Sequence, residues 1–297
     1  MQNAASYPGT FGNQSPAVTR SFPTAPVLAL IFAAYLAARA LEIIPNPIPR
    51  TAIVALDVLS ALAFAIVHGA RAWGLRAVLI FAGICTLVGN VMENLSVATG
   101  FPFGHYYFLE LMGPKLFQVP ILLGLAYIGM AYVSWVLGTL IAGRSRSRLA
   151  VPLTASFIMV AWDVAQDPVW STVLHGWAWQ QGGHWFGVPL SNFLGWYLTV
   201  FLIYLGFALY LRRCPATATA ANPALGGPAI SFYALCAAAN VCQVFRQPNP
   251  AVVQDPTGHA WAIADITAAS ALVSILLMGS FAAVALSRLG RRRAVTD

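Results

Sequence analysis

The chain has 297 residues, of which 59% are hydrophobic and only 8% are charged, and its mean hydropathy is +0.72. Soluble globular proteins carry about 25% charged residues, so this composition excludes an ordinary soluble protein. The net charge of +7 does not indicate a nucleic-acid partner, because the basic residues are spread among apolar segments and form no continuous basic face. The sequence therefore predicts an all-α, polytopic membrane protein.

Eight apolar windows are candidates for transmembrane helices, each of which needs about 20 residues. They predict a single transmembrane domain over residues 25–290, between a flexible tail at residues 1–24 and a basic tail at residues 291–297. The seventh window is short, so seven spans remain an alternative. The windows are Val27–Ile44, Thr51–His68, Arg76–Ala98, Val119–Ala142, Leu149–Val173, Pro189–Leu211, Ile230–Phe245 and Trp261–Ser287.

The basic residues predict the orientation of these spans, because cytoplasmic connections are enriched in Lys and Arg. With eight spans, one side of the membrane receives only Arg50, Lys115 and Arg246. The bias predicts that both termini lie in the cytoplasm, at the inner face of the cell membrane. The cytoplasmic side receives Arg20, Arg71, Arg76, Arg144, Arg146, Arg148, Arg212, Arg213, Arg288, Arg291, Arg292 and Arg293.

Acidic residues gather at one depth beneath the opposite, outer surface. With a rise of about 1.5 Å per residue, Glu93 lies about 25 Å along the third span, and Asp163 and Asp167 lie about 22 and 28 Å along the fifth. Glu42, Asp57 and Asp265 fall near the outer ends of three further spans. The acids outnumber the nearby bases, which favours the neutral form of at least one carboxyl group. A neutral carboxylic acid in an apolar pocket can donate a proton.

Some of these acids also have a purely structural explanation. Arg39 and Glu42 are three residues apart on one predicted helix, which is the spacing of an intrahelical ion pair. Asp57 and Asp265 fall early in their spans, where the helix dipole favours an acidic side chain. For these four residues a structural role and a functional role both remain open.

Asp163 and Asp167 favour a functional reading more strongly. They are four residues apart on one helix face, and Pro168 follows directly, which predicts a kink or a helix end. Glu93 belongs to a polar stripe with Asn90 and Asn94. Asn side chains alone can hold helices together, but a carboxyl group among them indicates a functional site.

Two aromatic connections on the outer side are rich in Gly and Pro. They cover residues 99–108 and 176–196. An interfacial belt of Trp and Tyr accounts for part of this composition. The Gly and Pro residues indicate in addition that both segments fold back as short re-entrant or amphipathic caps over the acids. An aromatic cavity that holds a few acids suits a hydrophobic substrate.

These motifs resemble a known family. Glu93 followed by TGFPFGHYYF, then LMGPKLFQVPILLGLAY, then WDVAQDPV and GWAWQQGGHWFGVPLSNFLGW are similar to the membrane-embedded carotenoid-biosynthesis family, over roughly residues 30–285. Its characterised members include the bisanhydrobacterioruberin hydratase and γ-carotene 1',2'-hydratase type. The resemblance implies addition of water, without a cofactor, to the terminal C1=C2 bond of an acyclic (ψ) carotenoid end. The motif positions that carry over are Glu93, Asp163, Asp167 and Asn192.

The chemistry of hydration suggests roles for the candidate residues. An acid must protonate C2, and water must then attack the tertiary cation at C1 and lose a proton to a base. We expect Asp163 or Asp167 to be the acid, and Glu93 or the other Asp to be the base. Aromatic rings would stabilise the cation, and Asn192 and Asn94 would hold the water. The expected substrate-binding aromatic residues are Trp162, Trp170, Trp196, Tyr106, Tyr107 and Phe103.

The reaction requires no metal, flavin or nicotinamide. A metal site is not expected either, because the histidines on the outer side lack ligand spacing. The expected partners are a lycopene-like or monocyclic carotenoid, water, membrane lipid and other enzymes of the same pathway, with no nucleic acid. Two alternatives stay open. A carotenoid end-group cyclase or isomerase begins with the same protonation. A proton-coupled carrier of a hydrophobic solute would use the acids as a relay, although the sequence shows no clear internal repeat.

Overall fold

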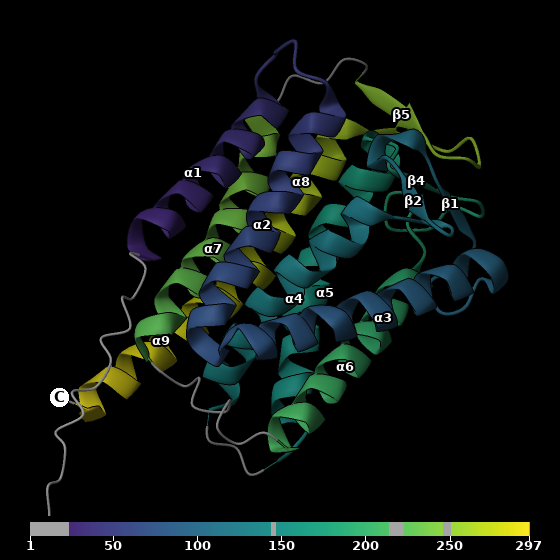
Figure 1. Cartoon of the computed structure of the whole chain (residues 1–297). Helices are drawn as coiled ribbons and strands as arrows, with labels where there is room; N and C mark the ends of the chain where they lie inside the picture. The colour runs from purple at the N-terminus through teal and green to yellow at the C-terminus, as the bar shows by residue number, and fades with distance from the viewer. Residues whose placement is uncertain (1–23, 144–146, 214–222, 246–250, 297) are drawn as a thin grey trace, which may run out of the picture.

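The computed structural model describes residues 24–143, 147–213, 223–245 and 251–296. Within these ranges, long helices form a bundle and short strands pair at one of its ends (Figure 1). The helices are α1 (Thr24–Ile43), α2 (Arg50–Trp73), α3 (Leu75–Thr99), α4 (Ile121–Ala142), α5 (Ala150–Pro168), α6 (Leu190–Arg213), α7 (Pro223–Cys242), α8 (Ile263–Val273) and α9 (Gly279–Thr296). The strands are β1 (Tyr106–Phe108), β2 (Lys115–Leu116), β3 (Val119–Pro120), β4 (Trp177–Trp179), β5 (Val252–Gln254) and β6 (Ala260–Ala262).

The helices confirm an all-α, multi-pass membrane protein. In the described part of the chain, seven helical segments are long and apolar enough to cross a bilayer. One of them, Ile263–Arg291, runs through α8 and most of α9 without a break. Helix α5 is an eighth long helix, and its 19 residues include the two predicted acids Asp163 and Asp167.

The three strand pairs mark one end of the bundle, which we call the strand end. Strand β1 pairs with β4, β2 with β3, and β5 with β6, each time antiparallel. The β1–β4 pair joins the two aromatic connections, which lie far apart in the sequence. Because β1 follows α3, and β4 follows α5, this pairing brings the ends of two acid-bearing helices together.

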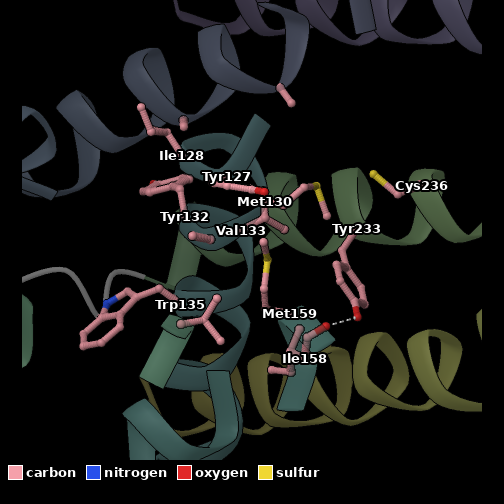
Figure 2. Close-up of a cluster of buried hydrophobic side chains, with 14 of the residues drawn as sticks. Tyr127, Ile128, Met130, Tyr132, Val133, Trp135, Ile158, Met159, Tyr233 and Cys236 are labelled. Atoms are coloured by element: carbon pink, nitrogen blue, oxygen red, sulfur yellow. Dashed lines mark hydrogen bonds between the residues drawn. The ribbon is translucent and has the colours of Figure 1, made fainter. Parts of the chain in front are cut away.

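Helix α4 occupies the centre of the bundle, where it packs against α2, α3, α5, α7 and α9. Two of its glycines allow this close packing. A Cβ atom at Gly129 would lie 2.8 Å from that of Ala61 in α2, and one at Gly138 would lie 2.9 Å from that of Ala155 in α5. Most of the core beneath the strand end is apolar (Figure 2), and the polar groups buried in it include the imidazole of His68 and several hydroxyl groups. Among them, Tyr233 of α7 donates a hydrogen bond of 2.7 Å to the carbonyl oxygen of Ile158 (Figure 2).

Helix α5 changes its winding where the sequence predicts a kink or an end. After Pro168 the chain continues as one π-helical turn over Val169–Val173, closed by a hydrogen bond of 2.9 Å from the amide of Leu174 to the carbonyl of Val169. Proline supplies no amide hydrogen for a regular α-helix. Such wide turns occur frequently at functional sites. A second π-helical turn, Ser274–Met278, joins α8 to α9.

The structure describes most of the predicted C-terminal tail but almost none of the predicted N-terminal tail. Residues 1–23 lie outside the described ranges. At the other end, α9 extends to Thr296, so the basic segment that begins at residue 291 continues the last helix.

Candidate active site

Four buried polar side chains from three helices meet in one cavity at the strand end. Glu93 lies in the last two turns of α3, Asp163 and Asp167 lie one turn apart on α5, and Asn192 lies in the first turn of α6. All four are at most 8% exposed. Every residue that lines the cavity is buried or half-buried. The fold therefore brings the predicted catalytic residues together in one interior cavity.

Asn192 connects the two aspartates. Its Nδ2 atom donates a hydrogen bond of 3.2 Å to Oδ2 of Asp163 and another to Oδ2 of Asp167. The i,i+4 spacing on α5 points both carboxyl groups toward α6, where one amide reaches both. The second oxygen of Asp167, Oδ1, accepts a hydrogen bond of 2.9 Å from Nε1 of Trp177. Both oxygens of Asp167 are therefore occupied as acceptors.

Glu93 is held by two phenol groups. The hydroxyl of Tyr106 in β1 donates to Oε2, and that of Tyr127 in α4 donates to Oε1. Each carboxylate oxygen thus accepts one hydrogen bond inside the cavity.

The β1–β4 pair decides which aromatic side chains face the acids. Successive side chains of a strand point to opposite faces. Tyr106 and Phe108 accordingly point inward and are buried, and they pair with Trp179 and Trp177 of β4. Tyr107, which lies between them, points outward and is 44% exposed. The predicted caps are therefore a two-stranded sheet that covers the acids.

Aromatic rings form most of the remaining wall. Trp196 of α6 stacks on Phe103 with a centroid distance of 5.1 Å, and it meets Tyr127 edge-on at 4.4 Å. Trp170 and Trp177 lie parallel at 6.5 Å. Of the predicted substrate-binding residues, those that line the cavity are Phe103, Tyr106, Trp162, Trp170, Asn192 and Trp196.

Two predicted binding residues lie outside the cavity. Tyr107 faces away from it because of the strand alternation described above. Asn94 follows Glu93 on α3 and points to another side of the helix. There its Oδ1 accepts a hydrogen bond of 3.1 Å from the amide of Gln118, and its Nδ2 donates one of 2.7 Å to the carbonyl of Asn90. Asn94 therefore fastens the loop between β2 and β3 to α3.

Several residues that line the cavity are not among those predicted from the sequence, and they include Tyr127, Trp177 and Trp179. Trp177 and Trp179 belong to the second aromatic segment, and only the strand register shows which of its indoles face inward. Tyr127 is one of two tyrosines in the apolar helix α4. A phenol among aliphatic residues is a weak signal, because tyrosine also packs in membrane interiors and interfaces.

Of the other acids in the predicted layer, Asp57 lines the cavity, whereas Glu42 and Asp265 do not. Arg39 and Glu42 form the expected ion pair, with 2.9 Å between Nη1 and Oε2. Asp57 also lies near Arg39, with 4.0 Å between Oδ1 and Nη1, and both Arg39 and Asp57 line the cavity. Asp265 lies in the first turn of α8, where it is exposed and outside the cavity.

The fold and the cavity define a multi-pass membrane protein with buried carboxyl groups in an aromatic interior space. A family model described as "carotenoid biosynthesis protein" matches residues 52–255, from α2 to β5. The chain therefore belongs to the carotenoid biosynthesis protein family, which supports a biosynthetic role with carotenoids as substrates. No curated protein and no solved structure matches the chain significantly.

Proposed function

We propose that the protein is a carotenoid 1,2-hydratase, a hydro-lyase that adds water to the terminal C1=C2 bond of an acyclic (ψ) carotenoid end. The observation that carries this proposal is the pair of buried aspartates joined by Asn192 in an aromatic cavity. Alkene hydration needs an acid, a base and a dry environment for the cation between them. The cavity offers all three from the chain's own side chains.

Asp163 is the proton donor in this proposal. Asn192 occupies its Oδ2, whereas no described residue donates a hydrogen bond to its Oδ1. A carboxyl oxygen without a donor can carry the acidic hydrogen and point it at the substrate. Two carboxylates beside one amide would repel each other if both were charged, so a single proton shared by the pair is the favourable state.

Asp167 is the base. The acidic hydrogen passes from Asp163 to C2 as the electrons of the π bond form the new C–H bond, which leaves a tertiary cation at C1. A water oxygen then bonds to C1, and its surplus proton passes to Asp167. The aspartate pair holds one proton before and after the reaction, so the cycle closes when that proton returns from Asp167 to Asp163.

Glu93 and the aromatic rings stabilise the cation. Two phenol partners hold Glu93 in place, and in its carboxylate form it balances the developing positive charge. The faces of Trp196 and Trp170 supply cation–π stabilisation, worth about 2 kcal/mol when the cation is desolvated. Tyr106 holds Glu93 in place and closes the cavity from β1.

The membrane arrangement supports a substrate that stays partly in lipid. We place the strand end at the outer surface and both termini in the cytoplasm, following the bias of the basic residues. The polyene chain then extends into the bilayer while one end group enters the cavity. The acids lie at one end of the bundle rather than in a chain across it, which favours an enzyme over a proton-coupled carrier.

Expression in a host that accumulates an acyclic carotene tests the reaction directly. A hydratase adds the mass of one water to the pigment, and in ¹⁸O-labelled water the new hydroxyl carries the label. A pigment of unchanged mass with a ring at its end would show a cyclase. A hydroxyl oxygen taken from dioxygen would show a hydroxylase. Either result would contradict the proposal.

A further inference from the structure

A second polar cluster separates the cavity from a neighbouring vestibule. The vestibule lies between α1, α2, α5, α7 and α8. Its rim includes the exposed residues Ile44, Pro45, Ile48 and Arg50 in and beside the connection between α1 and α2, so it reaches the protein surface. The cavity, in contrast, has no exposed residue in its lining. A hydratase consumes one water for each turnover, and this water needs a route into the cavity.

Three residues line both spaces: Arg39, Gln166 and Trp170. Hydrogen bonds hold two of them in position. Nε2 of Gln166 donates to Oδ1 of Asn240 at 2.7 Å, and Nε1 of Trp170 donates to Oε1 of Gln166 at 3.2 Å. Gln166 lies between Asp163 and Asp167 in the sequence, so the wall of the vestibule and the catalytic pair share one turn of α5.

Arg39 has one unused donor in this wall. It is 5% exposed, Nη1 contacts Glu42, and Nη2 donates to Oδ1 of Asn240 at 3.2 Å. Its Nε has no hydrogen-bond partner among the described residues. Oδ1 of Asp57, 4.0 Å from Nη1, is likewise buried without a donor. A buried donor and a buried acceptor that stay unpaired destabilise the folded protein.

We infer that Arg39 and Asp57 form a water-binding site at this wall, through which the reacting water passes from the vestibule to the aspartate pair. A water molecule accepts a hydrogen bond from Nε of Arg39 and donates one to Oδ1 of Asp57, which satisfies both groups. The inference rests on the proposed hydratase function. It makes Asp57 a positioning residue, which acts on the water and not on the carotenoid.

The partition of the cation between two products tests this inference. If water is scarce, the C1 cation loses a proton from a methyl group to the aspartate pair and gives an isomer with a terminal methylene group at C1 and no added water. In D₂O this isomer carries deuterium at C2, which marks it as a product of turnover. The ratio of hydrated to isomerised product does not depend on how much folded protein is present.

We expect Asp57→Leu, in the full chain in membranes with lycopene as substrate, to lower this ratio by about tenfold, as for a lost hydrogen bond to a charged group. Asp57→Asn keeps an acceptor and restores most of the ratio. Ser270→Ala, in the lining of the vestibule but not of the cavity, is the matched control. If Asp57→Leu gave the same ratio of hydrated to isomerised product as the wild type, the water site would be refuted. The hydrated product itself would still support the hydratase function. If the wild type gives no hydrated product, both proposals fail.

A second measurement avoids any change in the core. Ile44→Cys places a thiol on the rim of the vestibule, where Ile44 is 58% exposed. A bulky thiol reagent at this position should lower the ratio relative to the wild type treated in the same way. The same label on Phe117→Cys, at a 79% exposed position outside the vestibule, should not. Equal ratios for the two labelled variants would contradict the route.

If the site instead held a hydroxyl group of the substrate, Asp57→Leu would change the KM for hydroxylated carotenoids and leave the ratio unchanged, which also overturns the inference.

Discussion

Trp177 and Asp167 are joined by a hydrogen bond of 2.9 Å between the indole Nε1 and the carboxylate Oδ1. This bond ties β4 directly to the last turn of α5. The π-helical turn after Pro168 and the short connection to β4 bring the chain back, so that an indole ten residues further on reaches the carboxylate. The strand pair therefore helps to position Asp167 as well as covering it.

Removing the donor of Trp177 should slow the reaction without opening the cavity. Trp177→Phe keeps an aromatic ring on β4 but leaves Oδ1 of Asp167 without its partner. We expect hydration to fall about tenfold, measured as product formed per amount of membrane protein. Trp185→Phe is the matched control, because Trp185 donates to the carbonyl of Val164 outside the cavity. Equal losses in both variants would argue for a general packing effect.

Substitution of Asn for each of the two aspartates should change the products of the reaction in different ways. Asp163→Asn removes the acid, so both hydration and formation of the deuterated isomer should fall by about 10²–10⁴-fold. Asp167→Asn removes the base, so hydration should fall while some isomer still forms. Asp265→Asn, which changes an exposed acid of α8, should leave both unchanged. Full hydration by both Asp163→Asn and Asp167→Asn would show that the acid lies elsewhere.

The phenol partners of Glu93 give a graded prediction. Tyr127→Phe and Tyr106→Phe each remove one donor from Glu93 while keeping the ring. Each should reduce kcat by about tenfold, and the double variant by more, because the carboxylate then loses both donors. KM for the carotenoid should change little, since the aromatic wall is kept. A large rise in KM with an unchanged kcat would place these tyrosines in substrate binding instead.

The membrane bundle could be predicted almost entirely from the sequence. Each of the eight apolar windows corresponds to a helical segment, because length and hydrophobicity are local properties that a bilayer requires of each span. The ends of the helices are predicted less accurately than their presence. The seventh predicted window begins at residue 230, whereas α7 begins at Pro223 and continues through Pro228. An internal proline suggests a helix end in the sequence, but packed neighbouring helices accommodate it.

The candidate catalytic acids can be located from the sequence, because acids within membrane spans are rare and their depth can be counted along each span. Glu93, Asp163, Asp167 and Asn192 do meet in one cavity. What the sequence could not supply was the direction of side chains outside the helices. The pairing of β1 with β4 depends on residues about 70 positions apart in the chain, and a shift of one residue would reverse the faces of Tyr106 and Tyr107.

Gly195 should tolerate no side chain. A Cβ atom there would lie 2.7 Å from Cδ1 of Phe103 and 2.7 Å from the carbonyl oxygen of Pro102. Gly195→Ala must therefore push the first aromatic connection away from α6, which moves Phe103 out of its stack on Trp196. We expect destabilisation of about 1–3 kcal/mol and a loss of hydration, measured by thermal unfolding in detergent and by pigment analysis. Gly124→Ala is the control, because a Cβ atom at Gly124 in α4 meets no atom within 4 Å.

Asp255 gives a pH-dependent prediction outside the membrane spans. Burial alone would raise its pKa, but hydrogen bonds from Thr257, Trp261 and His259 outweigh this effect and hold the pKa below its ordinary value. Oδ1 accepts from the amide of Thr257 at 2.9 Å, and Oδ2 accepts from Nε1 of Trp261 at 2.9 Å. The carboxylate thereby closes the turn between β5 and β6.

A lowered pKa in the folded state means that the carboxylate stabilises this turn above the ordinary aspartate pKa of about 3.9. The stabilisation is lost as the pH falls through the lowered value. We therefore expect Asp255→Asn to reduce amide protection in β5 and β6 by about tenfold at neutral pH, as measured by hydrogen exchange. After correction for intrinsic exchange, the wild type and the variant should converge at acidic pH. A difference that persists undiminished below the lowered pKa would show that the charge of Asp255 does not hold the turn.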